Sequence, residues 1–234
     1  MKKFFRKCLY FLGLEGISRI LLQQSDLKDN GWFTSVKTKQ AVDKNGNPIP
    51  WLTYPLIDFL RDRLDQSMDL FEYGAGNSSI YYAGRVKSVT SIEHSAEWYK
   101  IIKANDKFNY ENLDIRLVEA PQELVKDGYH EMAFTDDVND YVRSVRESGQ
   151  KYDIIVVDGL FRNSCIIECL PSLSDRGVVF LDNTHYKYQK QLKKGTDHMT
   201  DHGFKRLDFW GMGPIYATKS CTTIFYRNDN CLSI

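Results

Sequence analysis

The sequence predicts an α/β protein with a doubly wound, mostly parallel sheet. From Met68 onward, short apolar strand patterns alternate with helical patterns. The run Tyr152–Val157 is apolar almost throughout, which suits a central strand covered by helices on both faces. Acidic residues follow several predicted strands, and in an open α/β sheet the carboxyl ends of the strands face the ligand crevice.

Length and composition indicate one sizeable domain with an appendage. The chain has 234 residues, of which 42% are hydrophobic and 26% charged, as in ordinary globular proteins. Lys+Arg and Asp+Glu both number 31, so the net charge does not indicate a nucleic-acid partner. Five cysteines without a C-x-x-C pair argue against a disulfide framework or a zinc knuckle. We expect a cytoplasmic protein with a main domain over 51–234 and a helical or loop appendage over 1–50.

The first residues of the chain predict an amphipathic helix. Five apolar residues fall on one helical face beside basic residues, namely Phe4, Phe5, Cys8, Leu9 and Leu12. The simpler interpretation is a helix packed on its own domain or on a second subunit. The alternative is a helix that lies on a membrane surface. The apolar run Cys8–Leu14 is too short to span a bilayer.

The expected elements follow one another regularly from residue 51 onward. Pro55 suits the first turn of a helix whose apolar residues continue to Leu64. The predicted strands are Met68–Gly74, Ser88–Glu93, Leu113–Val118, Tyr152–Val157 and Gly177–Leu181, with a closing pair at Lys205–Trp210 and Cys221–Arg227. The predicted helices are Ser78–Arg85, one through Trp98 and Ile102, Asp136–Ser148, Asn163–Leu173 and His185–His202.

The first of these strands breaks into closely spaced glycines. Gly74 and Gly76 have no Cβ, so the backbone of this turn can approach a ligand. Asn77 and Ser78 can cap the helix that follows. The pattern predicts a nucleotide-sized site.

Two cofactor classes compete for this turn. The dinucleotide fingerprint is G-x-G-x-x-G/A with an acidic residue about 20 positions on. Here Ser79 stands at the third glycine position, and Glu93 lies nineteen residues after Gly74. An NAD(P)-dependent oxidoreductase is therefore one hypothesis. Glu72, a carboxylate beside the turn, favours instead a cofactor that carries a positive charge.

The chain from about Trp51 to Arg227 resembles class I S-adenosylmethionine (SAM) dependent methyltransferases. The resemblance rests on four segments, EYGAGNSS at 72–79, SIEH at 91–94, VVDG at 156–159 and VFLDN at 179–183. It implies a seven-strand sheet with an antiparallel last strand. It also implies a set of cofactor-binding residues around SAM: Glu72, Gly74, Gly76, Asn77 and Ser78 at the methionine end, Glu93 and His94 at the ribose, Glu119 and Ala120 near the adenine, and Asp158.

A narrower resemblance concerns metal-dependent O-methyltransferases of the catechol and macrolide-sugar type. These carry an aspartate after strand four and Asp-Asp or Asp-Asn after strand five, which Asp158, Asp182 and Asn183 match. Three oxygen donors suit Mg²⁺, which would hold two substrate oxygens and lower the pKa of a hydroxyl. The alternative is that these residues cap helices and shape the rim of a pocket without a metal.

The general base differs from the catechol-type pattern. Those enzymes place a lysine three residues after the strand-four aspartate, where this chain has Phe161 and then Arg162. His185 is the best local candidate, since a neutral imidazole can accept a hydroxyl proton near pH 7. A surface histidine at a helix start is the simpler interpretation. Asp158 is the second predicted catalytic residue.

We therefore expect methyl transfer to an oxygen of a small-molecule or glycan-like acceptor, with no nucleic-acid partner. The predicted pocket segments are Trp51–Tyr54, Tyr186–Lys194 and Trp210–Tyr216. Beside the oxidoreductase, a third hypothesis is a non-catalytic, SAM-binding methyltransferase-like domain kept as a cofactor-sensing or interaction module, for which the N-terminal amphipathic helix would be the important feature.

Overall fold

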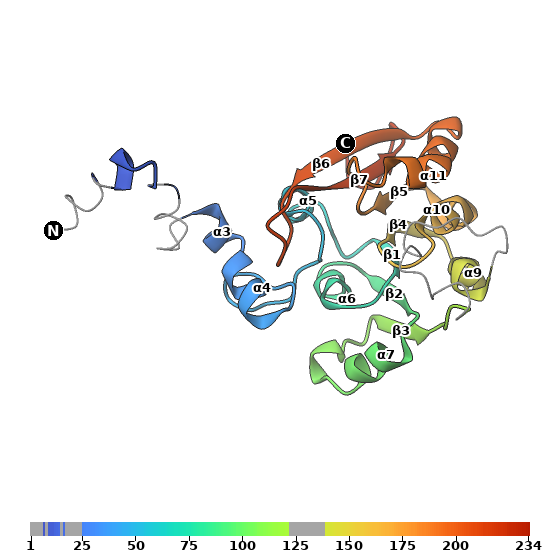
Figure 1. The fold of residues 1–234 in the computed structure, drawn as a ribbon. Coiled ribbons are helices and arrows are strands. Elements are labelled where there is room, and N and C mark those ends of the chain that lie inside the picture. Colours follow the sequence, from blue (N-terminus) through green and yellow to red (C-terminus); the bar gives the residue numbers. More distant parts are fainter. Residues whose placement is uncertain (1–6, 8, 15, 17–24, 122–138) are drawn as a thin grey trace.

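The computed structural model describes residues 7, 9–14, 16, 25–121 and 139–234 (Figure 1). Its centre is a seven-stranded sheet of order β3-β2-β1-β4-β5-β7-β6. Strands β1 to β5 are parallel, and β7 is antiparallel to both β5 and β6. The bounds are β1 Asp69–Tyr73, β2 Ser88–Glu93, β3 Leu113–Leu117, β4 Tyr152–Val157, β5 Leu173–Leu181, β6 Lys205–Gly211 and β7 Ser220–Tyr226. The predicted fold class is confirmed.

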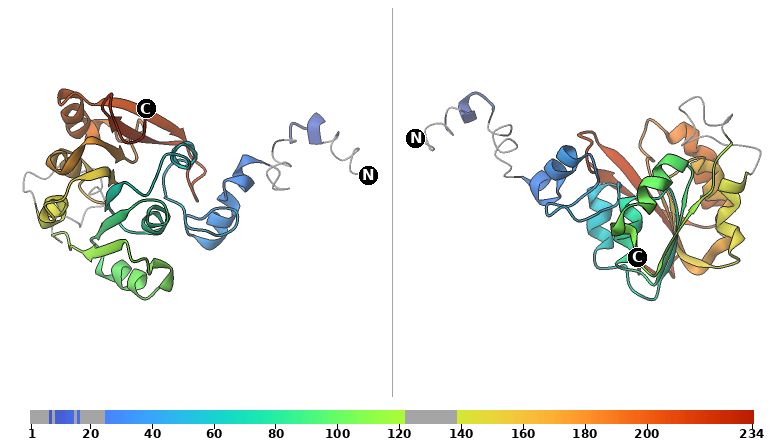
Figure 2. Two further views of the ribbon diagram at one scale, coloured as in Figure 1. Left: turned by 180° about the vertical axis from the view of Figure 1, so that it is seen from behind. Right: turned by 90° about the horizontal axis from the view of Figure 1, so that it is seen from below.

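Helices cover both faces of this sheet, as the right-hand view of Figure 2 shows. One face carries α5 (Tyr54–Leu60), α6 (Asn77–Ala83) and α7 (Ala96–Lys103), and the other carries α9 (Asp140–Glu147), α10 (Arg162–Glu168) and α11 (Gln189–Asp201). Two short helices, α3 (Asp26–Asp29) and α4 (Trp32–Thr38), lie toward the N-terminal end in Figure 1. Single 3₁₀ turns occupy Asp106–Phe108 and Leu170–Ser172.

Strand β4 shows why the sheet forms in this way. Ile155 and Val157 point into the core under α9, α10 and α11, while Ile154 and Val156 point into the core under α5 and α6. All four side chains are buried. Because successive residues of a strand face opposite sides, this burial shows that both faces of the sheet are covered here. The continuous apolar run is therefore the signature of a strand covered on both faces.

Several predicted boundaries differ from the structure, and the largest differences concern β5, α10 and α11. Strand β5 begins at Leu173 rather than Gly177, and its pairing with β4 shifts between Tyr152 and Ile154. Helix α10 ends at Glu168 rather than Leu173, because Pro171 lacks the N–H that a continuing helix needs. Helix α11 begins at Gln189, so His185 lies on the loop that precedes it.

The N-terminal region is joined to the domain from residue 25 onward. Trp32 Nε1 donates to the carbonyl oxygen of Tyr216 at 3.1 Å. Ala41 and Ile49 are buried in the core under α5, although they precede the expected domain boundary at residue 50. Most of the predicted amphipathic helix, with Phe4, Phe5 and Cys8, falls outside the described residues. Among the described residues, no helix has the length and apolar character that crossing a bilayer requires.

Candidate functional site

The glycine turn lies at the point where the strand order reverses. Strand β1 has β2 on one side and β4 on the other, so the chain builds the sheet outward in two directions from it. In doubly wound sheets this switch point is where ligands bind. Gly74 has a φ of 95°, in the left-handed region that favours glycine. A Cβ at Gly74 would lie 3.1 Å from the carbonyl oxygen of Asp158. The missing side chain therefore lets the turn after β1 pack against the turn after β4.

Gly76 differs from Gly74, because no described part of the chain requires a glycine there. Its φ of 179° is extended backbone that any residue adopts. A Cβ at this position would meet no atom of the described chain within 4 Å. The space beside Gly76 is thus open, as the backbone of a ligand-binding turn needs.

Glu72 supports this turn from below. Its side chain is buried, and Oε2 accepts hydrogen bonds from Ser79 Oγ at 2.6 Å and Ser91 Oγ at 2.8 Å. Ser79 Oγ in turn accepts from the backbone N–H of Gly76 at 3.1 Å. Burial raises the pKa of Glu72 to about 7, although hydrogen bonds from Ser78, Ser79 and Ser91 act in the opposite direction. The serine at the third glycine position therefore connects the turn to β1.

Glu93 and the glycine turn meet at the end of β2. Glu93 is 3% exposed, and its Oε2 accepts a hydrogen bond of 3.3 Å from the backbone N–H of Ala75. Its other oxygen, Oε1, accepts from the N–H of Ser95 at 2.7 Å. On the far side of the turn, Trp98 Nε1 donates to the carbonyl oxygen of Ala75 at 2.8 Å. The turn is thus held against both β2 and α7.

The other predicted cofactor-binding residues differ in their contacts and in their exposure to solvent. His94 Nδ1 lies 3.1 Å from Glu93 Oε1, a distance for an ion pair when the imidazole is protonated, although the two atoms form no hydrogen bond. Asn77 Nδ2 donates to the carbonyl oxygen of Ala41 at 2.8 Å, which fastens the N-terminal region to α6. Beyond β3, Glu119 is exposed and Ala120 is buried. Residues 122–138, which follow in the sequence, fall outside the described part of the chain.

The three predicted metal ligands surround an arginine. Arg162 Nη2 lies 2.9 Å from Asp158 Oδ1, and Nη1 donates to Asn183 Oδ1 at 3.0 Å. Asp182 Oδ2 is 3.8 Å from Nη1. The oxygens converge on the buried guanidinium of Arg162, which a metal there would have to displace. The predicted Mg²⁺ site stays a prediction. Within the described residues, no group of three or more His, Cys, Asp or Glu side chains is arranged to bind a metal.

The sequence analysis does not predict Arg162 as a site residue, because the catechol-type pattern places its lysine one residue earlier, at Phe161. Its side chain is 4% exposed and contacts the turn after β4, where Nε donates to the carbonyl oxygen of Gly159 at 3.1 Å. Phe161, just before it, has a φ of 49°, in the left-handed region that is strained for a bulky residue. Gly159, whose carbonyl oxygen accepts from Arg162, has no room for a side chain, because a Cβ there would overlap the Tyr141 hydroxyl. In the sequence, the only sign of Arg162 was its place in the segment V-V-D-G-x-x-R at 156–162.

Asp182 and His185 lie on the turn and loop that follow β5. Asp182 is buried and accepts a hydrogen bond from Thr222 Oγ1 on β7. Burial raises the pKa of Asp182, while Arg162 and Thr222 act to lower it. His185 Nδ1 is 3.2 Å from Ser220 Oγ at the start of β7. Burial lowers the pKa of His185, and the nearby carboxylate of Asp182 opposes that change.

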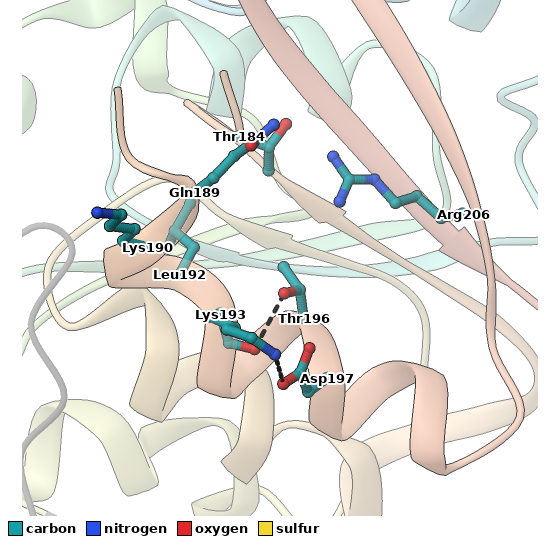
Figure 3. Close-up of a pocket in the computed structure, with 8 residues that line it drawn as sticks. All are labelled: Thr184, Gln189, Lys190, Leu192, Lys193, Thr196, Asp197 and Arg206. Carbon is teal, nitrogen blue, oxygen red and sulfur yellow. Dashed lines mark hydrogen bonds and ion pairs between the residues drawn. The ribbon is translucent and has the colours of Figure 1, made fainter. Parts of the chain in front are cut away.

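Two cavities of the described chain do not include the glycine turn, although Thr184, on the turn after β5, lines the first. One of about 340 Å³ lies between α11 and β6 and is shown in Figure 3, where Lys193 contacts Asp197 and Thr196. Its lining comprises Thr184, Gln189, Lys190, Leu192, Lys193, Thr196, Asp197 and Arg206. A second, of about 470 Å³, lies beside α3 and α5. Neither includes Gly76 or Glu93, so the candidate site is defined by the strand-end groups rather than by either cavity.

Comparisons with known proteins identify the fold. No model of a protein family matches the chain, and no curated protein matches its sequence. Among solved structures, a precorrin-6y C5,15-methyltransferase from Geobacter metallireducens is similar with a TM-score of 0.52 and 17% identity, over 82% of this chain and 96% of that one. A spermidine synthase bound to the transition-state analogue AdoDATO has a TM-score of 0.50 and 13% identity, over 74% and 57% of the two chains. An rRNA methylase from Streptococcus thermophilus has a TM-score of 0.47 and 15% identity, over 76% and 99%.

The chain therefore has the Rossmann-like fold of class I SAM-dependent methyltransferases. The strand order agrees with this, since the dinucleotide-binding order 3-2-1-4-5-6 has no antiparallel strand inserted next to β5. The resemblance drawn from the sequence is confirmed at the level of the fold.

Proposed function

We propose that this chain binds SAM at the glycine turn and transfers its methyl group to an oxygen of a small or sugar-like acceptor. The observation that carries the proposal is the contact between Ala75 N and Glu93 Oε2 at 3.3 Å. It joins the turn at the switch point to a carboxylate on the neighbouring strand. When bound, SAM supplies an electrophilic methyl group on a sulfonium.

The cofactor end is built from groups that are already oriented. Each carboxylate oxygen of Glu93 has two lone-pair directions, so one backbone hydrogen bond per oxygen leaves capacity to accept from two ribose hydroxyls. The open space at Gly76 admits the methionine end beside the backbone of Asn77 and Ser78. Glu72 supports the turn from beneath, and Glu119 with Ala120 would border the adenine.

At the acceptor end, His185 is the proposed general base. Its lowered pKa keeps the imidazole neutral near pH 7, as proton abstraction from a hydroxyl requires. Asp158, held by Arg162, would orient the acceptor hydroxyl by a hydrogen bond. Methyl transfer from a sulfonium is an in-line displacement, so orientation and deprotonation are the help that side chains can give.

Exposed aromatic rings support a sugar-like acceptor. Trp51 and Tyr216 pair with ring centroids 5.4 Å apart, and Tyr186 and Trp210 pair at 4.7 Å. Tyr186 is 76% exposed and Tyr216 is 60% exposed. Large exposed apolar surfaces mark binding sites, and the C–H face of a sugar ring packs on such rings. The four residues come from the three segments expected to shape the acceptor pocket.

The expected compartment remains the cytoplasm. Within the described residues, Cys165, Cys169, Cys221 and Cys231 are all free thiols, and the first three are buried. Free thiols of this kind are compatible with a reducing environment.

Calorimetry with SAM and S-adenosylhomocysteine tests cofactor binding. Glu93→Ala is expected to weaken binding at least ~10-fold, because it removes the ribose acceptor and a contact to the turn. The matched control is Glu97→Ala, which removes an exposed carboxylate on α7. Unchanged affinity in Glu93→Ala would remove that residue from the ribose role. Binding of NAD(H) without SAM binding would favour the oxidoreductase.

Transfer of labelled methyl groups from SAM tests the acceptor. A panel of sugars, catechols, amines and short RNAs is expected to show label on an oxygen of a sugar or small phenol. Label on RNA or on nitrogen would replace the proposed acceptor class. Tight SAM binding with no transfer to the whole panel would favour the non-catalytic module.

A further inference from the structure

Arg162 holds together the turns that follow β4 and β5. Its Nη2 donates to the carbonyl oxygen of Asp158 at 3.2 Å and pairs with Oδ1 of the same residue at 2.9 Å. Its Nη1 donates to Asn183 Oδ1 at 3.0 Å. A guanidinium remains charged at all accessible pH values, so this is a permanent cation at the acceptor end of the site.

The guanidinium and a divalent metal exclude each other here. Mg²⁺ needs oxygen ligands at about 2.1 Å in octahedral geometry, and it would need the same carboxylate of Asp158 and amide of Asn183. Two cations that share these ligands would also repel each other in a site of low solvent exposure.

The arginine is also linked to the proposed base by a chain of hydrogen bonds. Because Asn183 Oδ1 faces Arg162, its amide nitrogen Nδ2 points the other way and donates to Ser220 Oγ at 3.4 Å. Ser220 Oγ is 3.2 Å from His185 Nδ1. Asn183 has a φ of 59°, a conformation that asparagine tolerates and that sets its side chain between the two.

We propose that Arg162 takes the place of a metal ion, as a positioning residue that fixes Asp158 directly and His185 through Asn183 and Ser220. Asp158 and His185 then orient and deprotonate the acceptor hydroxyl without a divalent cation. This inference rests on the proposed methyltransferase function and adds to it that the transfer is independent of metal.

Metal binding is tested on the full chain after treatment with EDTA. Titration with Mn²⁺, followed by electron paramagnetic resonance, is expected to leave the free-ion signal undiminished. In NMR spectra, the Arg162 Nε–H is expected as a slowly exchanging signal that is absent from Arg162→Lys. Binding of one Mn²⁺ per chain that Asp158→Asn abolishes would overturn the inference.

Positioning is tested by chemical rescue. Arg162→Ala is expected to bind S-adenosylhomocysteine within about threefold of wild type, because the substitution leaves Glu93 and its contact with Ala75 in place. Its methyl transfer is expected to fall ~100-fold, to recover in part with millimolar guanidinium, and to be unaffected by Mg²⁺. Arg146→Ala, which removes a 2.8 Å ion pair with Glu168, is the control and should keep full activity. Full activity of Arg162→Ala, or its rescue by Mg²⁺, would overturn the inference.

A second variant covers the case in which Arg162→Ala does not fold. Ser220→Ala breaks the path between Asn183 and His185 and leaves Arg162 in place, so kcat should fall while KM for SAM stays constant. An unchanged kcat would count against the path. Failure of the wild type to bind S-adenosylhomocysteine would sink the proposed function itself, whereas SAM binding with Mg²⁺-dependent transfer would sink only the role of Arg162.

Discussion

Ser79 Oγ donates a hydrogen bond of 2.6 Å to Oε2 of Glu72, so the first turn of α6 is tied to the centre of β1. The carboxyl group at the other end of this bond is 1% exposed. A buried carboxyl that accepts from hydroxyls is still penalised in its charged form, which explains the raised pKa of Glu72. The stability of the turn therefore depends on pH.

The Glu72→Gln variant should lack this pH dependence. The folded protein binds the Glu72 proton more tightly than the unfolded chain does, with a pKa of about 7 against 4.5. The resulting stabilisation is complete below pH 4.5 and is lost as the pH rises through 7, and it amounts to at most about 3 kcal/mol. Urea unfolding between pH 4.5 and pH 8 should thus show wild type losing stability relative to the variant. Glu97→Gln, which changes an exposed carboxylate on α7, is the control. Identical dependence of stability on pH for Glu72→Gln and wild type would contradict the raised pKa of Glu72.

The two glycines of the turn should respond differently to alanine. Gly74→Ala is expected to lose roughly 1–3 kcal/mol of unfolding free energy, because its φ is positive and its new Cβ would crowd Asp158. Gly76→Ala is expected to stay within ~0.5 kcal/mol of wild type, because its Cβ enters open space. Yet Gly76→Ala should lose affinity for S-adenosylhomocysteine, since a bound cofactor would occupy that space. Calorimetry and urea unfolding measure both effects, and unchanged affinity in Gly76→Ala would place the cofactor elsewhere.

Two tryptophans offer a matched test of how the turn is held. Trp98→Phe keeps the ring and removes the donor to Ala75 O, which should cost about 1 kcal/mol of stability and weaken S-adenosylhomocysteine binding. Trp32→Phe removes a similar bond, to the carbonyl oxygen of Tyr216 and not to a residue of the turn, and should leave cofactor affinity unchanged. Equal affinities for the two variants would show that this hydrogen bond does not position the turn.

The proposed base predicts a pH profile. Because burial lowers the pKa of His185 below 6.5, kcat should be flat above pH 6.5 and fall only in more acidic solution. His185→Gln should reduce kcat ~10²–10⁴-fold. His198 also has a lowered pKa but lies on α11, so His198→Gln should keep the wild-type profile. Full kcat in His185→Gln would exclude it as the base.

Much of this architecture could be predicted from the chain. The order of strands and helices follows from local apolar periodicity, and the ends of β2 and β4 were placed correctly at Glu93 and Val157. The ends of α10 and β5 were not, because there the chain passes through Pro171 and a shift in pairing that depends on the neighbouring strand. The carboxylates Asp158 and Asp182 could be predicted as site residues from their positions after the strands, whereas the arginine between them, Arg162, was not predicted.

By itself the sequence determined the doubly wound fold and the glycine turn, since strand periodicity and glycines are local properties of the chain. Only the tertiary structure decided what those carboxylates face. Asp158 and Asp182 lie 24 residues apart in sequence, and the group between them is the guanidinium of Arg162, which follows the left-handed backbone of Phe161. The raised pKa of Glu72 likewise depends on the tertiary structure, in which Ser79 of α6 and Ser91 of β2 contact its carboxyl group. Desolvation depends on all the atoms around a group, and the sequence alone does not give them.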